Sequence, residues 1–174
     1  MQAPERLINN RTMQQIGFGG GCHWCTEAIF QALTGVEKVE QGWIASAAPF
    51  DAFSEAVVVH FDEEQIPLAV LVEIHLLTHS SAGRHRLRDK YRSAVYYFNP
   101  EDKMRAEAII GRLAGETGVA YITQVLPFAD FRLNQEAYLN YYQKDRQKPF
   151  CKTYIDPKLK ALREKFARRM RPEF

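Results

Sequence analysis

The sequence predicts an α+β fold, a two-layer sandwich in which helices cover a mixed sheet. Segments with the β-branched, alternating character of strands interleave with segments whose apolar residues recur at helical spacing. Strand segments often follow one another directly, which disfavours a doubly wound parallel sheet. At 174 residues the chain is long enough for one core and too short for two, so we expect a single domain over residues 1–174.

Local patterns place the individual elements. Glycines follow the first expected strand, and from Cys22 onward apolar residues repeat at helical spacing until Gly35. Asn99 and Pro100 are typical of a helix start. Together the elements predict a ferredoxin-like core with a helical C-terminal extension. The expected strands are 12–18, 36–44, 55–61, 93–98 and 119–126, and the later helices are 67–79, 99–115, 135–144 and 157–168.

Composition and charge exclude several classes of partner. The hydrophobic fraction of 46% and charged fraction of 25% are those of an ordinary globular protein. A net charge of +2 demands no anionic partner, and the basic runs at 84–92 and 158–171 carry no recognition motif, so we expect no nucleic-acid binding.

No apolar stretch is long enough to span a bilayer, and residues 1–6 lack the build of a signal peptide. We therefore expect a cytoplasmic protein without membrane contacts, and a monomer.

The most informative run is Gly-Gly-Gly-Cys-His-Trp-Cys at 19–25. It delivers Cys22 to the first turn of a helix, where unpaired N–H groups and the helix dipole favour a thiolate. Because the thiolate is the nucleophilic form of cysteine, this placement predicts reactivity. Cys25 follows one helical turn later, close enough to form a disulfide with Cys22.

Two other interpretations of these cysteines stay open. Cys22 and Cys25 are small apolar residues that an amphipathic helix can simply bury. They also have zinc-ligand spacing, and His75 and His79 lie one helical turn apart. The gap between the two pairs far exceeds that of a compact zinc finger, so we expect no metal.

Five segments, in order, resemble the methionine sulfoxide reductase A family. Its signature is a glycine-rich turn followed by Gly-Cys-Phe-Trp-Gly, one variable residue and Glu. Several ordered matches are far more specific than one motif. The matching segments are 19–27, Thr34-Gly-Val, Gly42-Trp43, 54–62 and Tyr91-Arg-Ser-Ala-Val-Tyr-Tyr.

The resemblance assigns an activity, that of a peptide-methionine (S)-S-oxide reductase, and roles for single residues. Cys22 would attack the sulfoxide sulfur and become a sulfenic acid as methionine leaves, which reverses a step of methionine oxidation. Glu55 would be the acid that protonates the departing oxygen, and Tyr91 would donate a hydrogen bond to it. Trp24 would pack on the substrate methyl group, and the signature residue Glu27 would be structural.

The resemblance also implies how the enzyme is restored. The sulfenic acid would condense with a second thiol, for which Cys151 is slightly favoured because many relatives keep a recycling cysteine on their C-terminal segment. Cys25 is the close alternative. Thioredoxin or a similar dithiol would then reduce the disulfide, with no bound cofactor, and the substrate would be methionine sulfoxide, free or in oxidatively damaged proteins.

The sequence departs from the family pattern around the expected substrate pocket. His23 replaces a phenylalanine that walls the methyl pocket; it would weaken methyl binding or assist proton transfer. Arg86 stands where the family has an aspartate, and Asp89 would substitute only with a different local turn. The loop before Glu55 is short and lacks the family's tyrosine. These changes predict low activity or an altered substrate.

Two other functions therefore stay open. A thiol–disulfide oxidoreductase would use Cys22 and Cys25 directly, although it would not need Glu55 or Tyr91. A catalytically weak module would bind methionine sulfoxide without turnover.

Overall fold

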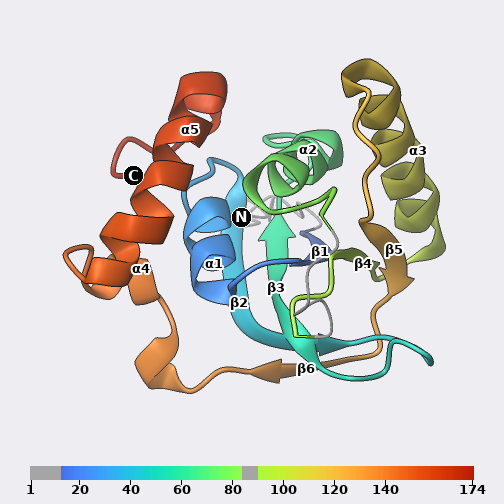
Figure 1. Ribbon diagram of the computed structural model, residues 1–174, viewed down its shortest axis with the longest axis horizontal. Coiled ribbons are helices and arrows are strands. Elements are labelled where there is room, and N and C mark those ends of the chain that lie inside the picture. Colours follow the sequence, from blue (N-terminus) through green and yellow to red (C-terminus); the bar gives the residue numbers. More distant parts are fainter. Residues whose placement is uncertain (1–12, 84–89) are drawn as a thin grey trace, which may run out of the picture.

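A computed structural model describes residues 13–83 and 90–174, which form a six-stranded sheet with helices packed against it (Figure 1). Helices α1 and α2 lie over the sheet, with α3 on one side of them and α4 and α5 on the other. The strands are β1 (Gln14–Gly19), β2 (Val36–Ala45), β3 (Ser54–Phe61), β4 (Ala94–Tyr97), β5 (Gln124–Pro127) and β6 (Asp130–Leu133). The helices are α1 (His23–Gln31), α2 (Leu68–Thr78), α3 (Pro100–Thr117), α4 (Tyr141–Lys144) and α5 (Asp156–Phe166).

The sheet has the order β5-β4-β1-β3-β2-β6. All neighbouring strands are antiparallel except β4 and β5, so the sheet is mixed, as expected. The central four strands, with α1 joining β1 to β2 and α2 joining β3 to β4, form the split β-α-β arrangement of a ferredoxin-like fold. The predicted core and the helical C-terminal extension are therefore confirmed.

The central strand β3 is buried on both faces, which explains its continuous run of valines. Val57 and Val59 belong to the main core beneath α1 and α2, where Phe18 of β1 stacks on Phe30 of α1 with ring centroids 4.6 Å apart. Val58 lies on the opposite face, in a smaller cluster with Tyr96 of β4. A strand covered on both faces favours apolar residues at every position rather than at alternate ones.

Helix α3 begins and ends at the signals visible in the sequence. The Asn99 side chain accepts a hydrogen bond from the backbone N–H of Asp102 at 2.9 Å, and Pro100 occupies the first turn. The helix continues two residues past the expected end, to Gly118, whose left-handed conformation (φ 71°) stops it. Within residues 13–83 and 90–174, no helix is long and apolar enough to cross a membrane.

Two expectations for the C-terminal half are wrong. The strand expected at 119–126 forms only at β5, because the chain just before it bonds to the segment after α2 instead: the Ile122 N–H donates to the Ser81 carbonyl at 2.7 Å. The helix expected at 135–144 is two short turns, Glu136–Tyr138 and α4, separated by Asn140 in the left-handed conformation (φ 53°). Strand β6 was not anticipated.

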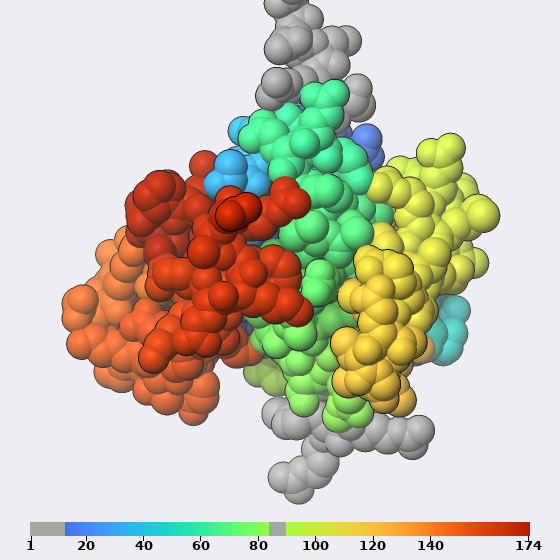
Figure 2. All heavy atoms as spheres, turned by 90° about the horizontal axis from the view of Figure 1, so that it is seen from above, coloured from blue at the N-terminus to red at the C-terminus, as the bar shows by residue number. Residues whose placement is uncertain are grey.

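Glu27 ties this irregular segment to α1. Its side chain is buried, and its two carboxylate oxygens accept the backbone N–H groups of Asn140 and Tyr141, each at 3.0 Å. These bonds satisfy the N–H groups at the start of α4 and hold the extension against α1. From above, the extension forms a lobe beside α2, on the side opposite α3 (Figure 2).

We expect Glu27→Gln to lower the free energy of unfolding by about 1–3 kcal/mol, because an amide replaces one acceptor oxygen with a donor that faces a backbone N–H. Urea denaturation measures the change, with Glu37→Gln on the exposed part of β2 as the matched control. Equal stability of the two variants would contradict a structural role for Glu27.

Candidate active site

Antiparallel pairing brings three segments together at one edge of the sheet. Gly19, the last residue of β1, lies opposite Ala56 near the start of β3 and opposite Ala94, the first residue of β4. The chain that leaves β1 therefore meets the chains that enter β3 and β4. Cys22, Glu55 and Tyr91 lie on these three segments.

A glycine turn places Cys22 at the helix start. Gly20 has φ 142°, and a Cβ atom there would lie 2.5 Å from Cδ2 of His79, so only glycine fits. The turn delivers Cys22 to the N-cap of α1, where its backbone carbonyl accepts the first helical hydrogen bond, from the Thr26 N–H at 3.2 Å. The side chain is partly exposed, as a reactive thiol requires.

The surroundings of Cys22 favour the thiolate. Its pKa lies below that of an ordinary thiol, first because the Cys25 thiol donates a hydrogen bond to it, although burial acts in the opposite direction. The backbone N–H groups of Trp24 and Cys25 add hydrogen bonds, while the charge of Glu55 opposes ionisation. The pKa of Cys25 is strongly raised, by the same thiol pair and then by burial. Within the pair, Cys22 is thus the more readily ionised thiol, and Cys25 keeps its proton.

Glu55 lies next to the start of α1 with little exposure, 8%. Its Oε2 accepts the backbone N–H of His23 at 3.2 Å, and its Oε1 lies 3.7 Å from Nζ of Lys90. Lys90 also lies over the ring of Tyr91, with Nζ 5.1 Å from the ring centroid. These contacts place an acid and a phenol beside the thiol.

A cavity of about 320 Å³ opens over Cys22, within the size range of small-molecule sites. Of the catalytic, resolving and substrate-binding residues expected from the sequence, Cys22, Cys25 and Tyr91 line it. Glu55 is not among the lining residues. The remaining lining residues are Gly20, Gly21, His79, Ser80, Phe150, Tyr154 and Lys158.

The structure does not bring His23 or Trp24 to the cavity lining. The ring of His23 is buried, with Nδ1 2.8 Å from the Gly42 carbonyl. The Trp24 ring stacks on Tyr141 of α4, with centroids 4.1 Å apart and an angle of 3° between the ring planes. Competing partners therefore hold both rings, and the extension supplies Phe150 and Tyr154 to the cavity instead.

Cys151 is fully buried in the π-helical turn Cys151–Ile155, which packs on α1. Its Sγ donates to the Asp145 carbonyl at 3.5 Å, and burial raises the pKa of its thiol. It belongs to the same core cluster as Cys25. All three thiols are free.

The two histidines of the zinc alternative have hydrogen-bond partners of their own. Nε2 of His75 lies 2.7 Å from the Gly19 carbonyl, and Nε2 of His79 lies 2.8 Å from Oγ of Ser93. Among the residues that the structure describes, no three His, Cys, Asp or Glu side chains are grouped to hold a metal ion. Asp89 and Arg86 lie outside the described residues.

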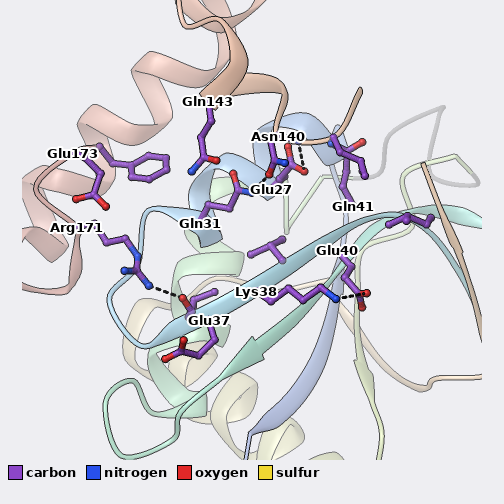
Figure 3. Close-up of a pocket in the computed structure, with 15 residues that line it drawn as sticks. Glu27, Gln31, Glu37, Lys38, Glu40, Gln41, Asn140, Gln143, Arg171 and Glu173 are labelled. Atoms are coloured by element: carbon purple, nitrogen blue, oxygen red, sulfur yellow. Dashed lines mark hydrogen bonds and ion pairs between the residues drawn. The ribbon is translucent and has the colours of Figure 1, made fainter. Parts of the chain in front are cut away.

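A larger cavity of about 620 Å³ lies between α1, β2 and the C-terminal residues (Figure 3). Charged and amide side chains dominate its wall, among them Glu40, Gln143 and Arg171, and Arg171 donates to the Val36 carbonyl at 2.6 Å. It contains no thiol. Of these two cavities, the smaller one is therefore the one that Cys22, Cys25 and Tyr91 line.

Sequence reasoning missed Lys90 and the wall formed by Phe150, Tyr154 and Lys158. Lys90 directly precedes Tyr91, and Phe150 directly precedes Cys151. Both residues are therefore adjacent to positions already named as candidates. For Lys158, whose Nζ donates to the Thr78 carbonyl at 2.6 Å, no signal in the sequence indicated the contact.

We expect Cys25→Ala to raise the pKa of Cys22, because it removes the largest contribution to thiolate stability. The loss of one hydrogen bond to a charged group predicts roughly tenfold slower alkylation of Cys22 by iodoacetamide near neutral pH. Rates measured against pH by peptide mass spectrometry test this, with Cys151→Ala as the control. An unchanged rate in Cys25→Ala would show that Cys25 does not activate Cys22.

Comparisons with known proteins identify the family of this chain. A model of the family described as peptide methionine sulfoxide reductase matches residues 14–170. The chain is 34% identical over 173 residues to the peptide methionine sulfoxide reductase MsrA of Acinetobacter baumannii (strain AYE), covering 91% of this chain and 99% of that protein. It is also 34% identical over 174 residues to the enzyme of the same name from Psychrobacter sp. (strain PRwf-1), with the same coverage.

Solved structures share the fold. Methionine sulfoxide reductase A of Corynebacterium diphtheriae superimposes with a TM-score of 0.68 at 22% identity, covering 78% of this chain and 76% of that one. Reduced Mxr1 from Saccharomyces cerevisiae gives a TM-score of 0.68 at 20% identity, covering 82% and 91%. The family match over nearly the whole chain shows that this protein belongs to the peptide methionine sulfoxide reductase family.

Proposed function

We propose that Cys22 attacks the sulfur of methionine S-sulfoxide, with Glu55 as general acid and Tyr91 as hydrogen-bond donor to the sulfoxide oxygen. The reaction class, thiol-dependent reduction of methionine sulfoxide, follows from the family. One observation supports these three roles. The stabilised thiolate of Cys22, the buried carboxyl of Glu55 and the phenol of Tyr91 lie at the same edge of the sheet.

The proposed step needs no group other than the substrate and these three side chains. The Cys22 thiolate forms a bond to the sulfoxide sulfur while the Glu55 proton moves to the sulfoxide oxygen. The hydroxyl then transfers to the Cys22 sulfur, methionine leaves, and Cys22 remains as a sulfenic acid beside an ionised Glu55. The methyl group of the substrate would rest on the apolar wall that Phe150 and Tyr154 supply.

We propose that Cys25, rather than Cys151, attacks this sulfenic acid first and releases water. Positional likeness to relatives favours Cys151, but the Cys25 thiol already donates a hydrogen bond to Cys22, whereas the Cys151 thiol donates to the Asp145 carbonyl. Cys151 would act second, taking over one sulfur of the Cys22–Cys25 bridge by thiol–disulfide exchange as the extension moves.

An external dithiol would complete the cycle. Mxr1 of Saccharomyces cerevisiae has been crystallised in complex with Trx2, and this chain matches that structure with a TM-score of 0.55 at 16% identity. We propose a thioredoxin-like reductant for this protein, acting in a reducing compartment such as the cytoplasm, in the repair of oxidised methionine.

With dithiothreitol as reductant, Cys22→Ser should abolish the reduction of methionine S-sulfoxide. Glu55→Gln should lower kcat about 10²-fold, because the sulfoxide oxygen then leaves without a proton donor. Release of methionine, measured for both sulfoxide epimers, checks this. Methionine release by Cys22→Ser would show that Cys22 is not the nucleophile. Full activity of Glu55→Gln would show that Glu55 is not the general acid.

After one turnover without reductant, peptide mass mapping should show a Cys22–Cys25 bridge, and Cys151→Ala should release the same single methionine per chain as the unmodified protein. Cys25→Ala should release methionine but accumulate the sulfenic acid, which dimedone traps. A Cys22–Cys151 bridge as the first product, present at the earliest time points, would instead identify Cys151 as the direct resolving thiol.

A further inference from the structure

Lys158 brings an ammonium group to the wall of the Cys22 cavity. Among the described residues that line this cavity, it is the only Lys, Arg, Asp or Glu. It lies in the first turn of α5, where Ile155 and Leu159 are buried in the main core and fix the backbone on either side. Its Nζ reaches Thr78, the last residue of α2, and donates to the Thr78 carbonyl at 2.6 Å.

The contact with Thr78 alone would make Lys158 a cap for α2. The last carbonyls of a helix have no partner within the helix, and a lysine there is stabilising. An ammonium group has three N–H bonds, however, and the Thr78 carbonyl takes only one of them. The ion pairs formed within residues 13–83 and 90–174 do not include Lys158, so this part of the chain supplies no counter-charge for it.

Lys90, on the segment that enters β4, differs from Lys158 in both respects. Its Nζ lies 3.7 Å from Oε1 of Glu55, and it is not among the lining residues. Lys158 is half-buried, and a charge that is partly removed from water is unfavourable unless an opposite charge approaches it. The cavity therefore favours a ligand that carries a negative charge at the Lys158 end.

The ammonium group also lies close to the two cysteines of the site. The pKa of Cys25 is raised chiefly by Cys22 and by burial, and the charge of Lys158 acts in the opposite direction. All three residues line the same cavity, whose volume of about 320 Å³ is at the lower end of the range for small-molecule sites. One small ligand can therefore contact Cys22 and Lys158 together.

We propose that Lys158 binds a carboxylate of the substrate close to the sulfoxide group. This inference rests on the proposed function. The α-carboxylate of methionine sulfoxide, as the free amino acid or at the C-terminus of a peptide, has this chemistry and follows the sulfur by a short carbon chain. An acidic side chain next to methionine sulfoxide in a protein is the second source. The sulfoxide sulfur then lies at Cys22 and the carboxylate at Lys158, whose head group is already held in place by the Thr78 carbonyl.

Initial rates with a pair of matched substrates test the proposal. N-acetylmethionine S-sulfoxide has a free carboxylate, and its methylamide is the neutral counterpart. We expect kcat/KM to be about tenfold higher for the carboxylate, through a lower KM, because a hydrogen bond between charged groups strengthens binding by about this factor. The ratio of the two kcat/KM values within each variant isolates the effect of the carboxylate from the effect of the variant on the reaction itself.

Three variants of α5 give the comparison. Lys158→Gln keeps an N–H donor for the Thr78 carbonyl but loses the charge, and should bring the ratio to about one. Lys158→Arg keeps the charge and should keep the preference. Lys160→Gln, at an exposed position two residues later, is the control and should keep it too. A ratio of about one in the unmodified protein, or a ratio that Lys158→Gln leaves unchanged, would overturn the α-carboxylate as the ligand of Lys158.

A second pair of substrates distinguishes the two sources of the carboxylate. Two peptides with blocked ends place aspartate or asparagine directly after methionine S-sulfoxide. A tenfold preference for aspartate that disappears in Lys158→Gln would support the carboxylate site and assign it to an acidic neighbour in a protein. The absence of a Lys158-dependent preference in both pairs would overturn the proposal.

Binding without reaction separates this inference from the proposed function. NMR titration of Cys22→Ser with the two N-acetyl compounds gives dissociation constants without turnover. About tenfold tighter binding of the carboxylate, lost when Lys158→Gln is added, would support the role of Lys158 even if the unmodified protein reduced neither compound. That lack of reduction would refute the proposed function alone. Reduction of both compounds with equal affinities and equal rates would overturn the α-carboxylate contact and leave the proposed function intact.

Discussion

The site depends on one geometric constraint, the antiparallel pairing of β1 with both β3 and β4. This pairing brings the end of β1 to the starts of the other two strands, so residues more than thirty positions apart in the chain meet at one edge of the sheet. The glycine turn after β1 then directs the chain into α1. Cys22 consequently receives the N–H groups of a helix start and lies beside Glu55.

The sequence was most informative where short-range chemistry decides the structure. Helix α3 begins at its Asn99-Pro100 signal, and the valine run of β3 marks a strand buried on both sides. The Cys22 placement also followed from local pattern. The segment 135–144 could not be predicted in this way, because its two turns depend on the carboxylate of Glu27, more than a hundred residues earlier. Long-range contacts of this kind leave no periodicity.

The same distinction applies to the candidate site. The residue types of Cys22, Cys25, Glu55 and Tyr91 were visible in the sequence, whereas the directions of the side chains were not. The Trp24 ring stacks on Tyr141 of the extension, and the His23 ring lies against the Asn134 side chain. In each pair the two residues are more than a hundred positions apart in the chain. The extension therefore does more than cover α1. Its contacts with Trp24 and His23 hold these two rings out of the cavity lining.

We propose that one thiolate, that of Cys22, stabilised first by the Cys25 thiol and then by the N–H groups at the start of α1, performs the reduction. A single-turnover experiment without external reductant tests it most directly, by counting methionine released from the S-sulfoxide against free thiols lost. We predict one methionine and one disulfide per chain, the thiol loss and the methionine rising together, with the rate following the ionisation of Cys22. Methionine release that is absent, or that continues after Cys22 is alkylated, would contradict the account.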